Sequence, residues 1–296
     1  MLAENQRMDP NFVQHVAAQT GLDPDQAEAR AVAGGSIASA WRLSDATKRL
    51  FIKGLPGESE AILDAERDGL ARLAAAGCIR TPAVIAWGHL DEVAWLAFEW
   101  CDMRRPDEAC FARLGHQLCE QHRRVGERFG LSRDNYIGST PQRNTPTRDW
   151  SDFFFHHRLA FQLDRLHRRT GGFGARTRER LENAWRRQVE GYRPEPSLLH
   201  GDLWNGNTAM LADGTPLVFD PAVHYGDREC DLAMADLFGG FSQAFFDTYR
   251  GAWPLEAGWE ERRRYYQLYH LLNHANLFGG HYIGICRKLI DDLGKA

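Results

Sequence analysis

The sequence predicts an α+β fold of two lobes, a small β-rich lobe over residues 1–100 and a larger α-helical lobe over residues 101–296. Short strand-like runs alternate with one long helical pattern in the first hundred residues, whereas helical periodicity dominates the rest of the chain. The length of 296 residues is enough for one large domain or for two modest lobes that bury a substantial core.

The first lobe combines short strands with one long helix. That helix is predicted over residues 58–76, because Leu63, Leu70 and Leu73 recur near helical spacing and Gly77 follows its end. The other elements expected in this lobe are a helix over residues 12–20 and strands over residues 50–53, 83–87 and 93–100.

The second lobe is expected to be mainly helical. Phe111, Leu114, Leu118, His122 and Val125 recur at spacings of three and four, which predicts a buried helix face. The other elements expected are a polar loop over residues 130–150, two arginine-rich helices over residues 152–190, strands and turns over residues 197–220, and three or four helices from there to the end.

The composition is that of a soluble globular protein, with 43% hydrophobic and 26% charged residues. A net charge of −4 argues against a broad nucleic-acid-binding surface. The start of the sequence lacks the apolar segment of a secretory signal, and the chain has no run of 18 apolar residues. The six cysteines are scattered without a C-x-x-C pair. We therefore expect a cytoplasmic protein with reduced thiols and with no membrane or nucleic-acid partner.

A cluster of polar residues with catalytic spacing lies between residues 198 and 231. Asp202 is followed five residues later by Asn207, and Asp220 ends a predicted hairpin that turns at residues 213–214. Protein kinases use this spacing: the first Asp orients the attacking hydroxyl and accepts its proton, and the Asn and the second Asp hold Mg²⁺. Each residue alone is more often a turn former than a catalyst, but the three together on a hairpin favour phosphoryl transfer from ATP.

The first lobe is then expected to hold the nucleotide. Lys53 ends a strand and Glu66 lies thirteen residues later in the following helix, so the two can form a pair that holds the α- and β-phosphates. Glu60 is a competing partner. A strand-edge lysine and a solvated helix glutamate are the alternative interpretation.

Two further nucleotide contacts are expected in the first lobe. The turn Gly34-Gly35-Ser36 leaves backbone N–H groups free to approach phosphate oxygens, although it lacks the G-x-G-x-x-G pattern. Glu99 and Trp100 end the last strand of the first lobe, where a hinge would meet the adenine. That assignment rests on position alone.

These features resemble the fructosamine kinase (ketosamine-3-kinase) family, relatives of the aminoglycoside and choline kinases within the protein-kinase-like fold. The resemblance covers about residue 12 to the C-terminus, and it departs from the family at His224, Cys230 and Gln121. It implies ATP- and Mg²⁺-dependent phosphorylation of the 3-hydroxyl of a ketosamine such as fructosamine or ribulosamine, after which the product decomposes and frees the amine. The matching stretches are residues 34–37, 134–142, 200–207, 220–223, 226–229, 231–234, 237–241 and 269–274.

Four residues near the catalytic motif are candidates for contact with the substrate. Trp204 follows Asp202 by two residues, and its indole either packs beneath the loop or faces the C–H side of a sugar. The resemblance favours the sugar contact, because the family carries Trp at this place. His224 and Tyr225 are expected to line the same cleft, and Asp227 to accept the ammonium or hydroxyls of the substrate.

Further polar residues in this lobe have competing interpretations. His270 and His274 are four residues apart on a helix and can form a zinc pair, but no Glu follows His270, which favours hydrogen-bonding histidines of the core. The resemblance implies that Asp231 anchors the catalytic loop from below. Arg228 and Glu229 either line the substrate cleft or form surface salt bridges.

The size of the substrate can also be inferred. Only ten residues separate Asp220 from the helix expected near Asp231, which is too short for a regulatory activation loop and favours a small substrate.

Phosphorylation of another hydroxyl, as in aminoglycoside or choline kinases, is the nearest alternative function. A nucleotide-binding regulator without turnover is a further alternative, which the intact catalytic residues disfavour.

Overall fold

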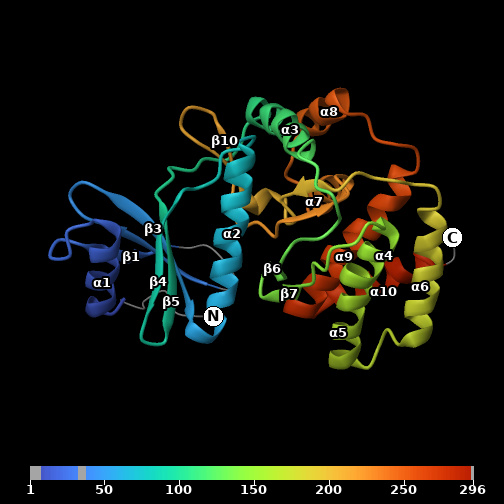
Figure 1. Ribbon diagram of the computed structural model, residues 1–296, viewed down its shortest axis with the longest axis horizontal. Coiled ribbons are helices and arrows are strands. Elements are labelled where there is room, and N and C mark those ends of the chain that lie inside the picture. Colours follow the sequence, from blue (N-terminus) through green and yellow to red (C-terminus); the bar gives the residue numbers. More distant parts are fainter. Residues whose placement is uncertain (1–7, 33–37, 295–296) are drawn as a thin grey trace.

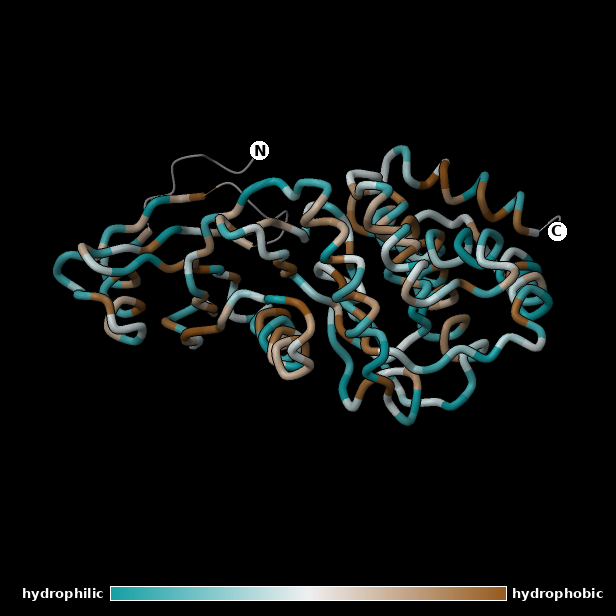
Figure 2. The backbone as a smooth tube through the Cα atoms, turned by 90° about the horizontal axis from the view of Figure 1, so that it is seen from above, coloured by the Kyte–Doolittle hydropathy of each residue, from teal (hydrophilic) through white to brown (hydrophobic). Residues whose placement is uncertain are grey.

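The computed structural model describes residues 8–32 and 38–294, and it shows two lobes that lie end to end along the longest axis (Figure 1). The smaller lobe contains a sheet with helices packed against it, and the larger lobe is mostly helical. The view from above shows the same elongated arrangement (Figure 2). Within the described ranges, no helix has the length and hydrophobicity that crossing a membrane requires.

The smaller lobe is a five-stranded antiparallel sheet with the strand order β1-β2-β3-β5-β4. Its apolar side chains alternate along each strand, so that Leu50 and Ile52 pack towards α1 and Leu55 and Phe98 pack towards α2. The elements are α1 (Pro10–Thr20), β1 (Glu28–Ala31), β2 (Ser39–Ser44), β3 (Arg49–Pro56), α2 (Glu60–Ala76), β4 (Val84–Leu90) and β5 (Val93–Glu99), with a 3₁₀ turn η1 (Gly57–Ser59) before α2.

Strand β3 is longer than the sequence predicts. It continues past Lys53 through Gly54, whose missing side chain makes room for the ring of Trp41; a Cβ there would lie 2.9 Å from that ring. The alternation of β3 places Lys53 on the face that α2 covers. Helix α2 ends as predicted, with Gly77 in the left-handed conformation.

The larger lobe is organised around the long helix α9, which packs against α5, α6, α7 and α10. Helices α4 and α5 are joined without a break by the π-helical segment η2. Val125 lies beyond the end of α3 and is exposed, so it does not belong to the predicted helix face. The helical elements are α3 (Glu108–His122), α4 (Trp150–Phe154), η2 (Phe155–Ala160), α5 (Phe161–Thr170), α6 (Ala175–Gln188), α7 (Glu229–Leu237), α8 (Gln243–Ala252), α9 (Trp259–Phe278) and α10 (His281–Leu293).

Three short hairpins or ladders complete this lobe. The predicted hairpin is present as β9 (Thr208–Met210) paired with β10 (Pro216–Val218), and β8 (Ser197–Leu199) pairs with β11 (His224–Gly226). The segment predicted as a polar loop contains an additional hairpin, β6 (Asn135–Ile137) and β7 (Thr140–Gln142). Its strands are only three residues long and have no apolar alternation, so the sequence pattern does not reveal them.

Candidate active site

The loop between β8 and β9 is held in place by Asp231, from the first turn of α7. Its Oδ2 accepts a hydrogen bond from the backbone N–H of His200 at 2.7 Å, and its Oδ1 accepts one from Gly201 at 2.8 Å. Nε2 of His122 lies 3.1 Å from Oδ2. Burial opposes ionisation of Asp231, but these hydrogen bonds and the nearby histidines outweigh it and lower its pKa. The predicted anchoring contact is therefore present.

The backbone at the start of this loop strongly favours glycine. Gly201 has a φ of +82°, and a Cβ at this position would lie 2.1 Å from the carbonyl oxygen of Ala222. Next to it, the backbone N–H of Asp202 donates to Nδ1 of His200 at 3.3 Å, so Nε2 carries the proton and donates to the carbonyl of Phe219 at 3.1 Å. Burial lowers the pKa of His200, which suits this neutral form.

The structure brings Asp202, Asn207 and Asp220 together, although the last is eighteen positions after the first. Nδ2 of Asn207 donates to the backbone oxygen of Asp202 at 3.0 Å, to its carboxylate Oδ2 at 3.2 Å and to the backbone oxygen of Asp220 at 3.4 Å. Asp220 has a φ of +55°, a left-handed conformation that is uncommon outside glycine and frequent at functional sites.

The carboxyl group of Asp202 is poised to exchange a proton near neutral pH. Burial and the negative charge of Asp220 raise its pKa to about 7, against the opposing effect of the hydrogen bond from Asn207. A carboxylate with such a pKa can take a proton from a hydroxyl more readily than an ordinary aspartate can.

The predicted contact between Lys53 and Glu66 is present, and Lys53 also reaches into the larger lobe. Its Nζ lies 2.7 Å from Oε1 of Glu66 and forms a second ion pair with Oδ1 of Asp220. Burial alone lowers the pKa of Lys53, but the two carboxylates outweigh it and raise it. Burial raises the pKa of Glu66 to about 7. Glu60, the competing partner, is exposed at the start of α2.

The donor atoms around Asp220 suit a magnesium ion. Burial opposes ionisation of Asp220, but Lys53 outweighs it and holds its pKa below the ordinary value, so the carboxylate is charged. Within the described residues, the Asn207 side chain makes three hydrogen bonds, and Nδ2 is the donor in each of them. The amide oxygen is therefore left to bind a cation. Carboxylate and amide oxygens are hard ligands that fit Mg²⁺.

This donor set is small, as expected for an ion that phosphates help to hold. Within residues 8–32 and 38–294, no group of three or more His, Cys, Asp or Glu side chains could hold a metal ion. Magnesium in kinases needs only one or two protein carboxylates plus the substrate phosphates, so Asp220 and Asn207 are enough.

His270 and His274 do not form a zinc site with other His, Cys, Asp or Glu side chains of the described residues, since no group of three such side chains lies together there. Nδ1 of His274 lies 2.9 Å from the carbonyl of His270, which agrees with hydrogen-bonding histidines.

Two of the remaining nucleotide candidates, Glu99 and Trp100, lie at the end of β5. Glu99 ends β5, and its side chain accepts from the backbone N–H of Ala83 at 2.6 Å and pairs with Arg80. The indole N–H of Trp100 donates to Asp102 at 2.8 Å. Gly34, Gly35 and Ser36 lie outside the described residues.

Trp204 is exposed beside the catalytic loop and does not pack beneath it. Its side chain is 37% accessible, and its ring covers Gly206, where a Cβ would lie 2.3 Å from the indole. Its ring centroid lies 6.3 Å from that of Phe238, in an edge-on arrangement. The position leaves an indole surface open two residues after Asp202.

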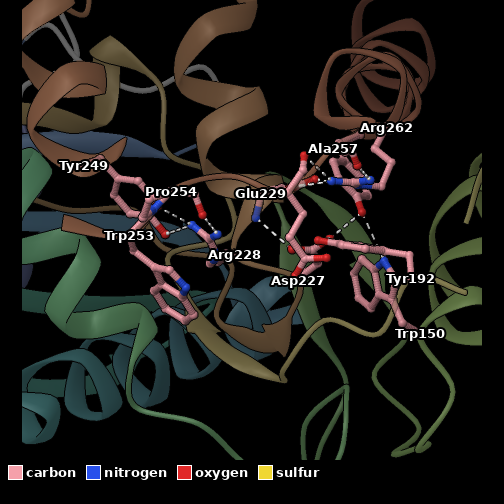
Figure 3. Close-up of polar contacts among 12 residues, drawn as sticks. Trp150, Tyr192, Asp227, Arg228, Glu229, Tyr249, Trp253, Pro254, Ala257 and Arg262 are labelled. Carbon is pink, nitrogen blue, oxygen red and sulfur yellow. Dashed lines mark hydrogen bonds and ion pairs between the residues drawn. The ribbon is translucent and has the colours of Figure 1, made fainter. Parts of the chain in front are cut away.

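Asp227 belongs to a buried network, so its prediction as a substrate contact is wrong. It is fully buried, and its Oδ2 accepts from the hydroxyls of Tyr266 at 2.5 Å and Tyr192 at 3.0 Å (Figure 3). Its Oδ1 accepts from the backbone N–H of Glu229 at 3.0 Å. Both oxygens are thus engaged within the protein, and burial raises the pKa of Asp227.

Arg228 and Glu229 are also buried, and neither lines a cleft nor forms a surface salt bridge. Glu229 pairs with Arg262 in two parallel hydrogen bonds of 2.8 Å and 2.7 Å (Figure 3). Arg228 donates to the carbonyl oxygens of Trp253 and Pro254, at 3.1 Å and 2.6 Å. Charged side chains such as these can be buried because each has a hydrogen-bonding partner. The residue type alone does not predict which partner that will be.

His224 and Tyr225 also depart from the prediction that they line the substrate cleft. His224 is buried, its Nδ1 lies 3.1 Å from the carbonyl of Ala222, and burial lowers its pKa well below the ordinary value. Tyr225 is half-buried, and its ring lies so close to Gly126 that a Cβ there would approach within 2.9 Å. The Tyr225 side chain packs against the buried cluster of Leu73, Leu198 and Val223.

Sequence reasoning gave no role to two buried amides that support the segment after Asp220. Nδ2 of Asn135 donates to the carbonyl of Val223 at 2.7 Å, and Nε2 of Gln142 donates to that of Ala222 at 3.0 Å. Both come from the β6–β7 hairpin. Both amides lie in residues 134–142, one of the stretches that resemble the family. Nothing in that stretch indicates which backbone groups its side chains contact.

The fold and the site together define a phosphotransferase of the protein-kinase-like class. Two acidic residues and an asparagine of the larger lobe meet a lysine–glutamate pair of the smaller lobe, as phosphoryl transfer requires. The chain belongs to the fructosamine kinase family, because the family model described as fructosamine kinase matches residues 8–296.

Known proteins agree with this assignment. A "Probable ketoamine kinase" of Synechocystis is 41% identical over 273 residues, which cover 92% of each chain. The crystal structure of a "putative fructosamine-3-kinase" from Thermobifida fusca superimposes with a TM-score of 0.84 at 32% identity and covers 98% of this chain and 100% of that one. An aminoglycoside-3'-phosphotransferase of type VIII, at 21% identity and a TM-score of 0.57, shares the fold; the match covers 89% of this chain and 99% of that one.

Proposed function

We propose that the protein transfers the γ-phosphoryl group of ATP to the 3-hydroxyl of a ketosamine such as a fructosamine or a ribulosamine. The observation that supports the chemistry is the convergence of Lys53 with Asp220, beside the Asp202–Asn207 hydrogen bond. Membership of the fructosamine kinase family supports the choice of substrate.

Asp202 acts as the base in this reaction. Its carboxylate orients the 3-hydroxyl and takes the proton as the oxygen bonds to the γ-phosphorus, while the bond from that phosphorus to the bridging oxygen breaks and its electron pair leaves with ADP. The hydrogen bond from Asn207 fixes the carboxylate in place. A pKa raised to about 7 makes Asp202 a stronger base than an ordinary aspartate.

Residues of the smaller lobe bind the nucleotide. Lys53 holds the α- and β-phosphates, and Glu66 keeps its ammonium group in position. Gly34, Gly35 and Ser36 cover the phosphates, and Glu99 and Trp100 lie beside the adenine. Asp220 and Asn207 hold the magnesium ion, which when bound neutralises charge on the phosphates.

Trp204 recognises the sugar. Its exposed indole lies in the same short loop as Asp202, so a sugar whose hydroxyl meets Asp202 is within reach of the ring. The C–H face of a sugar packs on aromatic rings of this kind.

The six cysteines support a cytoplasmic location for this activity. All of them lie in the described part of the chain, and all are free thiols in the structure. Proteins that keep several unpaired thiols suit a reducing compartment. We therefore propose a cytoplasmic location.

A substrate panel tests the proposal. Fructosamines, ribulosamines and erythrulosamines are incubated with the purified protein, ATP and Mg²⁺, and ADP release is measured together with the position of the new phosphate by ³¹P NMR. The expected result is a 3-phosphorylated ketosamine. Turnover of aminoglycosides or choline but of no ketosamine would assign another acceptor, and ATP binding without any turnover would indicate a regulatory protein.

A further inference from the structure

Exposed aromatic side chains gather beside the catalytic loop. Eight large hydrophobic side chains are exposed in the described part of the chain, and four of them, Trp204, Phe238, Phe278 and Ile285, come from the catalytic loop, the end of α7, the end of α9 and α10. Scattered single exposures are ordinary on a protein surface, whereas a contiguous group marks a binding surface.

The rings of this group are in contact with one another. The centroid of Phe238 lies 6.3 Å from that of Trp204 and 4.8 Å from that of His274, and His274 lies 5.5 Å from Phe278 and 5.2 Å from Tyr282. We call these five rings the aromatic strip. It runs without interruption from the catalytic loop across the end of α9 to the start of α10.

The aromatic strip is fixed relative to the catalytic loop by close backbone approaches. A Cβ on Gly240 would lie 2.3 Å from the side chain of Asn205, so the chain that follows Phe238 sits directly on the loop. The indole of Trp204 is equally close to Gly206. The position of the strip is therefore tied to that of Asp202.

The outer end of the aromatic strip faces solvent and carries no charge. Phe278 is 54% exposed, and Ile285 lies one turn after Tyr282 on the same face of α10. Figure 2 shows α10 on the outside of the larger lobe, where hydrophobic and hydrophilic residues alternate along the helix. Burial lowers the pKa of His274, so its ring is neutral at neutral pH and the strip favours uncharged groups.

The chemistry of a ketosamine places its amine nitrogen close to the catalytic loop. The reacting 3-hydroxyl is on C3, and the amine nitrogen is on C1, separated from C3 only by the C2 carbonyl carbon. When the hydroxyl meets Asp202, the nitrogen lies within a few ångströms of the catalytic loop, and whatever it carries must extend over the adjoining surface. The aromatic strip begins in that loop and continues outwards from it.

We propose that the aromatic strip binds the amine substituent of the ketosamine, and that the enzyme prefers ketosamines whose amine carries an aromatic group. This inference rests on the proposed function. Trp204 contacts the sugar, and the rings of Phe238, His274, Phe278 and Tyr282 receive the aromatic part of the amine by edge and face contacts.

The experiment compares two ketosamines that share the same sugar, one made from 4-phenylbutylamine, whose chain is long enough to carry its ring past Phe238, and one from butylamine. We expect kcat/KM for the phenylbutylamine compound to be about tenfold higher, from burial of the ring and its aromatic contacts. Phe278→Ser should bring that value close to the value for the butylamine compound. The matched control is Trp87→Ser, since Trp87 is a comparably exposed aromatic residue of β4 in the other lobe and should leave the preference intact.

Each alternative outcome has a distinct meaning. Equal kcat/KM for the two compounds, or a preference that Phe278→Ser does not change although thermal unfolding shows an intact fold, overturns the role of the strip and leaves the proposed function standing. Failure to phosphorylate either compound overturns the proposed function itself. If light scattering shows that the wild type is a dimer and Phe278→Ser a monomer, the strip is an interface between two copies and the proposal is wrong.

Discussion

Lys53 and Glu66 meet across the interface between β3 and α2, with 2.7 Å between the ammonium nitrogen and the carboxylate oxygen. Both side chains are largely buried, at 14% and 13% exposure. Lys53 pairs at the same time with Asp220 of the larger lobe, so a single ammonium group connects the two halves of the site. The position of α2 therefore helps to determine where the Lys53 ammonium group lies.

Glu66→Gln should weaken nucleotide binding. The substitution removes the carboxylate charge that holds the Lys53 ammonium group next to α2. The ammonium group then shifts towards Asp220 and away from the phosphates. We expect KM for ATP to rise about tenfold, since hydrogen bonds to charged groups contribute roughly 1.5–3 kcal/mol. Glu60→Gln, on the exposed first turn of the same helix, is the matched control. Steady-state kinetics with equal KM values for both variants would contradict this role of Glu66.

Asp202→Asn should reduce the rate and stabilise the protein. The amide cannot accept the proton of the hydroxyl, and general-base contributions predict a loss of about 10²- to 10⁴-fold in kcat. The carboxylate has an ordinary pKa of 3.8 and a folded-state pKa of about 7, so the folded protein binds the extra proton between these values and loses stability as the pH rises through that window. Above pH 7 the asparagine variant should be more stable, by on the order of 2 kcal/mol.

Chemical unfolding at pH 8 and at pH 3.5 separates these two effects. At the lower pH both forms are uncharged, and the difference in unfolding free energy should become small. A variant that is inactive because it is misfolded would instead be less stable at pH 8. Near-normal kcat in a well-folded variant would remove Asp202 from the mechanism.

The activity should fall as the pH drops through about 7. Asp202 must be ionised to accept a proton, and its raised pKa means that it becomes protonated below this value. The pH profile of kcat/KM reports groups of the free enzyme, so its acidic limb should show an apparent pKa near 7. The residual activity of Asp202→Asn should lack that limb. An unchanged kcat/KM down to pH 5 would show that Asp202 does not act as the base.

The sequence predicts which of the candidate catalytic residues meet, because their positions depend on local spacing. Asp202, Asn207 and Asp220 lie on one hairpin, so chain connectivity alone brings them close. Lys53 and Glu66 were also predicted, since the alternation of a strand and the turn of the following helix determine which faces meet. Where neighbouring elements in the chain form the site, patterns of residues are sufficient.

The substrate residues could not be predicted in the same way, because their environment comes from distant parts of the chain. Asp227 is polar and follows the catalytic hairpin, which suggests that its side chain is exposed. In the structure it is enclosed by Tyr192, from the loop after α6, and by Tyr266, from α9. Glu229 is likewise neutralised by Arg262, 33 residues further on. The sequence shows that such charges exist and gives no sign of which partners bury them.

Trp204→Ala should impair use of the sugar and spare the nucleotide. The exposed indole touches Gly206 and Phe238. Within residues 8–32 and 38–294, no hydrogen bond or ring contact joins the indole to Lys53 or Asp220, so its loss leaves these two groups in place. We expect kcat/KM for the ketosamine to fall about tenfold, as for the loss of one aromatic contact surface. The Kd for ATP, measured by calorimetry, should stay within twofold, about the precision of such comparisons. Unchanged sugar kinetics would place the substrate elsewhere.

Gly201→Ala should destabilise the protein and slow catalysis more than the same change at Gly191. The two glycines have similar backbone angles, with φ of +82° and +77°, so an alanine pays the same left-handed penalty of roughly 1–2 kcal/mol at both. Only at Gly201 would the new Cβ meet a backbone carbonyl, that of Ala222 at 2.1 Å, whereas nothing lies within 4 Å at Gly191. Relief of that clash must move the loop between His200 and Asp202, which should cost about a further 1–3 kcal/mol in urea unfolding and lower kcat. Equal unfolding free energies for the two variants would mean that the loop accommodates a side chain, and that close approach to Ala222 does not fix the position of Asp202.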